Sequence, residues 1–260
     1  MVDYGGALGR AWKYSLDGKR LGAGFVIFLV AAVIAISPIL FIYKTISLSA
    51  LNILTMIQFF AWMFVGIAVA GLLMLYAILM FTHNYANQKQ KNASRRFSLR
   101  NSAGFAVSNY PRFLAVTIVT VLISAIVSMV PFIGIILSII TGLMFFFTIQ
   151  EVAAGSRFSN SIRNSYDMFM EKKLDTFITF VLTGVISGVI ILVFAIPLFA
   201  VGMSVVFSAL SGGALMQALA ANMAGVVISG LILLAGFTFA TLFTNSVRTD
   251  VYAQLKNKRK

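Results

Sequence analysis

Six uncharged hydrophobic runs constrain the fold of this chain more than any other feature of its sequence. They cover residues 21–43, 53–81, 113–130, 132–150, 176–202 and 214–245. A helix needs about 20 apolar residues to cross the hydrocarbon core of a bilayer, and each run reaches or approaches that length. Pro131 separates the third run from the fourth, and its fixed φ and missing N–H favour a tight turn there. The runs predict an all-α polytopic membrane protein with six transmembrane helices, arranged as three hairpins in a single integral membrane domain, residues 1–260.

The composition agrees with this class and leaves little material for chemistry. Hydrophobic residues make up 60% of the chain and charged residues only 10%, whereas soluble domains carry about 25% charged residues. The chain has no Cys, a single His and seven Asp and Glu. Disulfides and thiolate sites are therefore excluded, and a metal centre or a catalytic acid–base set is hard to assemble. We expect no enzymatic activity, no cofactor and no metal.

The positions of the charges predict the orientation. The chain has 20 Lys and Arg against seven acids, for a net charge of +13. All the bases except Lys44, and all the acids, fall before the first run, after the last run, or in the segments that follow the second and fourth runs. Cytoplasmic loops of membrane proteins are enriched in Lys and Arg. We therefore expect both termini in the cytoplasm and a location in the cell (inner) membrane. We expect no nucleic-acid partner, because no recognised binding module accompanies the bases.

Each odd-numbered run follows a segment with apolar residues at helical spacing, at residues 8–16, 99–110 and 158–169. This spacing predicts amphipathic helices that lie in the cytoplasmic membrane interface. A Pro near the outer end of each odd-numbered run (Pro38, Pro131, Pro197) and a Phe–Thr pair closing each even-numbered run (81–82, 147–148, 243–244) suggest three repeats, residues 1–82, 95–150 and 157–245. The alternative is that any hairpin protein whose chain starts inside has this layout.

Residues 95–176 run from a basic linker through an amphipathic segment, a span, a VPFIG turn, a second span and a polar helix into the next span. This order, with Val130-Pro131…Gly134 and Ser161…Ser165, resembles the YciC-like bacterial inner-membrane proteins. It is also similar to the membrane domain found beside some glycerophosphodiester phosphodiesterases. The resemblance implies a six-helix membrane protein, and it brings no catalytic signature to this chain.

Polar and small residues within the runs have two interpretations each. Gln58, Gln217 and Asn222 either line a polar path or form hydrogen bonds between helices, and the second interpretation is favoured. No ionisable residue lies inside a run, which counts against proton-coupled transport. Gly184 and Gly188, with Ala221 and Gly225, form small-xxx-small patterns that allow helices to approach closely. They indicate packing of the fifth span on the sixth or, as an alternative, the interface of a homo-oligomer.

Charged residues outside the runs give further candidates. The densest basic patch is expected to contact anionic lipid headgroups, although topology alone also explains it; it comprises Lys89, Lys91, Arg95, Arg96 and Arg100. Asp167, Glu171 and Asp175 are spaced as one face of a helix and are expected to pair with basic residues of the chain, with a divalent cation or a basic partner as the alternative. Glu151 is expected to pair with Arg157 or to act as a gate. His83 is expected at headgroup level.

These observations favour a non-enzymatic membrane protein that acts in lipid organisation or envelope homeostasis, with the bilayer and its anionic headgroups as partners. The alternative is a channel or facilitator for a small or amphipathic solute that is not coupled to protons. The residues do not indicate a substrate, an oligomeric state or a protein partner.

Overall fold

The computed structural model describes residues 2–46, 53–90, 99–131, 133–210, 217 and 220–257. These residues form helices and connecting turns, without a strand among them. Six helical segments are long and apolar enough to cross a membrane, and they begin at Gly18, Met56, Leu99, Gly134, Lys173 and Met223. The predicted class, an all-α multi-pass membrane protein, is confirmed at this level.

The helices occur in the following order: α1 (Tyr4–Ser15), α2 (Gly18–Ile46), α3 (Ile53–Gln90), α4 (Leu99–Ser128), α5 (Gly134–Met144), α6 (Thr148–Ala153), α7 (Phe158–Glu171), α8 (Lys173–Leu210) and α10 (Met223–Asn257). The hydrophobic runs at 21–43, 53–81 and 176–202 fall within α2, α3 and α8. Helices α3 and α10 continue well past the ends of their runs, because no Pro or Gly follows to end them.

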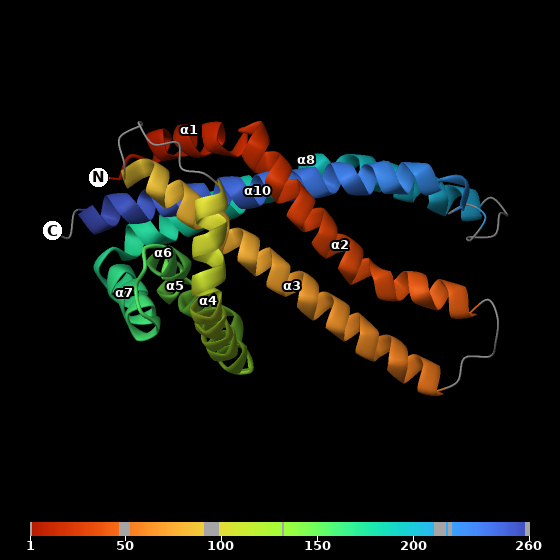
Figure 1. Ribbon diagram of the computed structural model, residues 1–260, viewed down its shortest axis with the longest axis horizontal. Coiled ribbons are helices and arrows are strands. Elements are labelled where there is room, and N and C mark those ends of the chain that lie inside the picture. Colours follow the sequence, from red (N-terminus) through yellow and green to blue (C-terminus); the bar gives the residue numbers. More distant parts are fainter. Residues whose placement is uncertain are drawn as a thin grey trace.

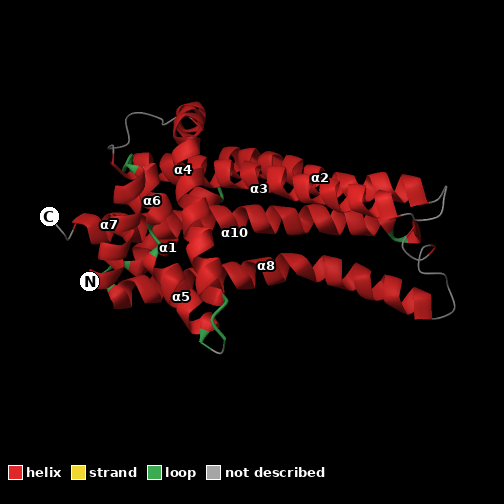
Figure 2. Ribbon diagram, turned by 90° about the horizontal axis from the view of Figure 1, so that it is seen from below, coloured by secondary structure: helices red, strands yellow, loops and turns green. Residues whose placement is uncertain are grey.

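The long helices form two side-by-side pairs, α2 with α3 and α8 with α10, and α10 also contacts α2 and α3 (Figures 1 and 2). Helices α4 and α5 pack on each other and run steeply across the direction of α8 and α10 in Figure 1. Both ends of the chain lie at one end of the molecule together with α1, α6 and α7 (Figures 1 and 2). We call this the charged end, since α1, α7 and the last turns of α10 carry Lys, Arg, Asp and Glu.

Short polar side chains start the first two helices. The backbone N–H of Gly6 donates to the Asp3 carboxylate at 2.8 Å, which caps α1. The N–H groups of Lys19 and Arg20 donate to Asp17 Oδ1 at 3.0 and 3.3 Å, which caps α2 and separates it from α1. Such caps satisfy N–H groups that have no partner inside the helix.

The predicted turn at Pro131 is present. Helix α4 ends at Ser128, and the N–H of Gly134 donates to the carbonyl of Val130 at 2.9 Å as α5 begins. A Cβ at residue 134 would overlap the backbone of Ser128, so this position requires Gly.

Two predicted segments differ in their helices. The fourth apolar segment, Gly134–Ala153, is long enough to cross a membrane, but it consists of two helices, because α5 ends at Met144 and α6 begins at Thr148. The Ser165 hydroxyl of α7 donates to the Met144 carbonyl at 2.9 Å and accepts from the Phe147 N–H at 3.2 Å, so the break leaves these groups satisfied. In contrast, residues 99–110 do not form a separate helix. They continue through Pro111 into the apolar run as α4, and Ser108 and Asn109, which could cap a new helix, donate instead to the Phe105 carbonyl of the preceding turn.

Most of the buried side chains lie towards the charged end. One cluster includes Tyr14, Phe28, Phe81 and Phe113, and a second includes Phe147, Phe243, Val247 and Tyr252. The Phe of all three Phe–Thr pairs is therefore buried. Elsewhere the helices expose large apolar side chains; in α4 and α8 only 11% of the most apolar stretch is buried. Exposed apolar area of this extent is typical of surfaces that face lipid or another protein.

Candidate anion-binding site at the charged end

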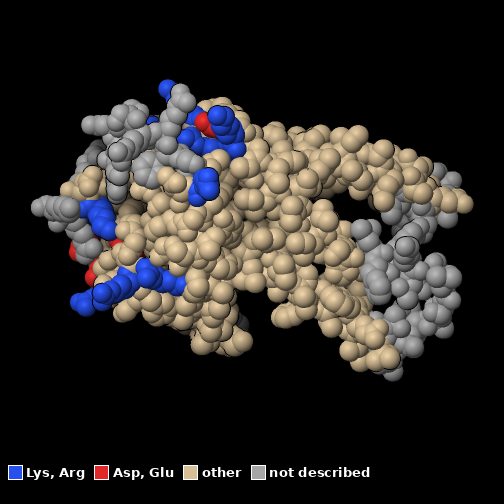
Figure 3. All heavy atoms as spheres, viewed as in Figure 1, with Lys and Arg blue, Asp and Glu red and all other residues tan. Residues whose placement is uncertain are grey.

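Figure 3 shows the basic and acidic side chains of the described residues gathered at the charged end, while the other described residues on this face are uncharged. The exception in the described chain is Lys44, in the last turn of α2 at the other end. The predicted separation of charged and uncharged ends is thus present in the fold. Three helices from distant parts of the sequence meet at the charged end, α1, α3 and α10.

Asp250 of α10 joins these three helices. Its side chain is completely buried. Arg10 of α1 donates to both carboxylate oxygens, from Nε at 2.7 Å and from Nη2 at 3.0 Å, and the Tyr85 hydroxyl of α3 donates at 2.9 Å. Gln254 donates from one turn further along α10 at 3.0 Å. The hydrogen bond to Asp250 raises the pKa of Arg10, so this guanidinium stays charged.

Glu151 of α6 forms a second buried network. The Tyr252 hydroxyl donates to it at 2.7 Å and the Lys256 ammonium lies 3.2 Å away. Ser156 and Asn164 donate at 2.6 and 3.1 Å. Ser156 reaches back because α6 ends in a Schellman turn, with Gly155 at φ 87°. The prediction that Glu151 pairs with Arg157 is wrong. The four partners named above hold the Glu151 side chain in place, which argues against a role as a gate.

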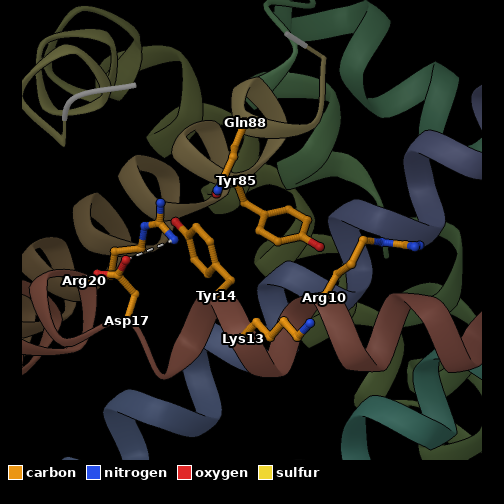
Figure 4. Close-up of a pocket in the computed structure, with 7 residues that line it drawn as sticks. All are labelled: Arg10, Lys13, Tyr14, Asp17, Arg20, Tyr85 and Gln88. Carbon is orange, nitrogen blue, oxygen red and sulfur yellow. Dashed lines mark hydrogen bonds and ion pairs between the residues drawn. The ribbon is translucent and has the colours of Figure 1, made fainter. Parts of the chain in front are cut away.

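A cavity of about 430 Å³ opens beside the Asp250 network, between α1 and the end of α3 (Figure 4). We call it the α1–α3 cavity. Its lining combines three cations, one carboxylate, two tyrosines and an amide: Arg10, Lys13, Tyr14, Asp17, Arg20, Tyr85 and Gln88. The rings of Tyr14 and Tyr85 meet edge to face, with centroids 4.8 Å apart.

The walls of the α1–α3 cavity are fixed by buried hydrogen bonds. The Tyr14 hydroxyl donates to the Phe81 carbonyl at 3.2 Å and lies 3.0 Å from Asn84 Oδ1. Burial raises the pKa of Tyr14, so this hydroxyl stays protonated. The guanidinium of Arg20 lies over the Tyr14 ring, 4.2 Å from its centroid. The N–H groups of a guanidinium lie in its own plane, so Arg20 can contact the ring and still donate hydrogen bonds sideways.

Several donors in the cavity remain available. The closest approach of Arg20 to Asp17 is 3.7 Å, which is beyond hydrogen-bond distance. Lys13 is exposed and forms no ion pair with the described residues, and Gln88 forms no side-chain hydrogen bond with them. The cavity is therefore suited to an anion with several acceptor oxygens.

The predicted lipid-contact residues are described only in part. Lys91, Arg95 and Arg96 lie outside the described residues. Lys89 lies in the last turn of α3, and Arg100 is exposed in the first turn of α4. Both helix ends belong to the charged end.

The structure does not place the predicted glycine pair between the helices. Gly184 and Gly188 are exposed on α8, with open space where a Cβ would be, and Ala221 is also exposed. The interpretation that the glycine pair packs α8 on α10 is wrong within one chain. Gly225 does pack on α8, where a Cβ would lie 3.3 Å from Val201. The closest approach is at Gly236 of α10, which packs directly on Phe194 of α8 and is not among the predicted packing residues.

The polar residues of the runs do not meet in a cavity described here. Gln58 and Gln217 are exposed and Asn222 is half-buried. None of them lines the α1–α3 cavity or the groove of about 490 Å³ between α4 and α5. Ser128 and Ser138, which line that groove, donate to carbonyls of their own helices, at 2.7 Å each.

The acidic row is divided between two helices. Asp167 and Glu171 belong to α7, whereas Asp175 belongs to α8 and accepts from the Tyr4 hydroxyl at 3.0 Å. The break at Lys172 therefore overturns the prediction of a single acidic face. Asp167 lies 3.9 Å from Arg163, both partly exposed. His83 is half-buried and stacks on Phe105, with ring centroids 3.7 Å apart.

No protein-family model, curated protein sequence or solved structure matches this chain. The resemblance to the YciC-like proteins stays a prediction.

Sequence reasoning missed the Asp250 network and the cavity beside it. One signal was available: Asp250 is the only acid after the last hydrophobic run, in a segment that otherwise carries bases. A lone acid in a basic segment points to an internal partner, but the identity of Arg10 and Tyr85 as partners required the fold.

Proposed function

We propose that this protein organises lipid at the cytoplasmic face of the inner membrane by binding anionic headgroups with its charged end. The observation that carries the proposal is the arrangement of the described cations: apart from Lys44, they gather at one end of apolar helices whose sides are largely uncovered. Anionic lipids attract such clusters by about 1 kcal/mol for each Lys or Arg near the membrane surface.

The exposed faces of α1 and α7 support an interfacial position for these helices. On α1, Trp12 is 49% exposed and Lys13 is exposed beside it, and Leu16, which directly follows the helix, is 55% exposed. On α7, Phe158 and Tyr166 are exposed with Arg163. Trp and Tyr are enriched at headgroup depth, and interfacial helices combine apolar and basic side chains. In this arrangement both termini lie in the cytoplasm.

The buried carboxylates support a non-enzymatic function. Asp250 and Glu151 are each surrounded by hydrogen-bond donors from their own chain, and those donors define structural joints rather than a reacting site. The alternative, a conduit without proton coupling, has less support, because Gln58, Gln217 and Asn222 do not share either cavity described above. A homo-oligomer stays a prediction.

Lipid analysis of the purified protein tests this function. Mass spectrometry should find phosphatidylglycerol enriched among the lipids that co-purify in mild detergent, relative to the membrane of origin. Replacing Arg95, Arg96 and Arg100 together by Gln should lower this enrichment, because three cations are removed. The matched control replaces the same three residues by Lys, which keeps the charge and should keep the lipid.

Two results would contradict the proposal. One is a co-purified lipid mixture identical to that of the source membrane. The other is solute flux in proteoliposomes above that of protein-free vesicles, which would favour the conduit.

A further inference from the structure

The α1–α3 cavity has the size of a ligand site. Small-molecule sites in proteins measure about 300–1,000 Å³, and this cavity of about 430 Å³ lies within that range. It exceeds the volume of a single phosphate and leaves room for the group that a phosphate is attached to. Its lining comes from α1, the first turn of α2 and the last turns of α3.

The charges around the cavity leave net positive charge inside it. Asp250 is engaged by Arg10, and Asp3 lies 3.8 Å from the same guanidinium on the outer side. Asp17 is the one acid of the lining. Its carboxylate caps α2 and also lies 3.7 Å from the Arg20 guanidinium. Lys13 is balanced by no carboxylate among the described residues.

The Arg20 guanidinium is held in position before any ligand arrives. Tyr14 supports the guanidinium of Arg20 from one side, and Tyr14 is itself fixed by Phe81 and Asn84. Figure 4 shows the Arg20 guanidinium and the end of the Gln88 side chain directed towards one another, whereas the Lys13 ammonium lies beyond Tyr14, towards Arg10. Preorganised donors lower the entropic cost of binding, and the fork of an Arg matches phosphate oxygens.

With the charged end at the membrane surface, as proposed above, the cavity lies at the depth of the lipid phosphate groups. Arg20 directly precedes the apolar run that begins at Leu21, and the neighbouring α1 exposes Trp12 and Leu16. We propose that the α1–α3 cavity binds a phosphate group, contacted by Arg20 and Gln88 and attracted by the positive charge of Lys13 in the same lining, and that an anionic phospholipid headgroup presents it. The choice of a lipid rests on the proposed function, whereas the phosphate chemistry rests on the cavity.

Native mass spectrometry of the full-length protein in detergent tests this site. The protein is titrated with short-chain phosphatidylglycerol and, separately, with diacylglycerol, which lacks the phosphate. The wild type should bind phosphatidylglycerol first and more tightly. Lys13→Gln should weaken binding of the first phosphatidylglycerol about fivefold, since one cation near a headgroup contributes about 1 kcal/mol. The double variant Lys13→Gln/Arg20→Gln should weaken it further.

The matched control is Lys19→Gln/Lys173→Gln. It removes two exposed charges from the same end without altering the lining of the cavity, and it should leave binding of the first lipid unchanged. Arg20 lies over the Tyr14 ring, so replacing it can lower the stability of the protein. If the double variant does not fold, the single variant Lys13→Gln, which removes an exposed side chain, still tests the site.

A second arm separates the two sources of phosphate. Inorganic phosphate is added at constant ionic strength, and the melting temperature in detergent is compared with that in chloride. A rise in the wild type that is absent in Lys13→Gln, without any preference for phosphatidylglycerol, supports the site with a free phosphate and rejects the proposed lipid function. A lipid preference that survives in the double variant but is lost on replacing Arg95, Arg96 and Arg100 overturns the site and leaves the proposed function standing. No response to either probe overturns both.

Discussion

Asp250 and Glu151 show how a residue in an apolar protein keeps its charge while buried. Each carboxylate accepts several hydrogen bonds, and each is paired with a cation, Arg10 or Lys256. Burying a carboxylate without partners is costly, and removing one partner of a buried pair leaves the other charge uncompensated. These residues therefore act as joints that fix α1, α3 and α6 on the end of α10.

Asp250→Asn should lower the stability of the protein strongly. The variant loses the bidentate ion pair with Arg10 and leaves a buried amide with fewer matching donors, and because the Arg10 side chain is half-exposed and can turn to solvent, we expect a cost of about 1–3 kcal/mol. The measurement is the thermal unfolding midpoint in detergent. The control is Asp167→Asn, which removes a partly exposed contact with Arg163 at 3.9 Å, where about 0–1 kcal/mol is expected. Equal midpoints for the two variants would contradict the structural role of Asp250.

The pairing of α8 with α10 shows what determines the contact faces of two helices with similar apolar sequences. The Gly184–Gly188 face of α8 is open, while Gly236 of α10 receives the Phe194 ring of α8. Apolar periodicity cannot distinguish these faces, because a lipid tail and a neighbouring helix are equally apolar surroundings. The close contact is decided by the fit of one aromatic side chain to one missing Cβ.

Gly236→Ala should destabilise the protein, because the added methyl group overlaps Phe194 and forces α8 and α10 apart. Overpacking of this kind costs about 1–3 kcal/mol. Gly188→Ala is the matched control: the substitution is the same, the helix is apolar and nothing lies within contact distance, so we expect no loss. Thermal unfolding in detergent compares the two. A loss of stability in Gly188→Ala alone would show that the open face of α8 is a contact, as in a homo-oligomer.

At the scale of the whole molecule, the charges gather at one end while the three predicted hairpins are not parallel. Helices α4 and α5 lie across α8 and α10 in Figure 1, so the turn at Pro131 is directed away from the far ends of the long helices. Transmembrane helices tilt to different extents, according to their packing. The six apolar segments remain long enough to cross a membrane.

Single cysteines should reveal the orientation, since the chain has no native Cys. An impermeant thiol reagent added outside cells should label cysteines at Ser47, Ser211 and Met129, whereas one at Ser159 should react only after the membrane is opened. Met129 is 79% exposed at the end of α4, so its labelling tests whether the α4–α5 pair crosses the bilayer. Labelling of the Ser159 variant in intact cells would contradict the predicted orientation.

The sequence by itself determined the six apolar helices, the turn at Pro131 and the separation of charged from uncharged ends. Each of these depends on local hydrophobicity, on the geometry of one residue or on the order of charges along the chain. Only the tertiary structure decided the partners of Asp250 and Glu151, the break between α5 and α6 and the contact face of α8. Arg10 and Asp250 are 240 positions apart, so no local pattern relates them. The α1–α3 cavity belongs to the same group, because it exists only where the beginning of the chain meets the end of α3 beside α10.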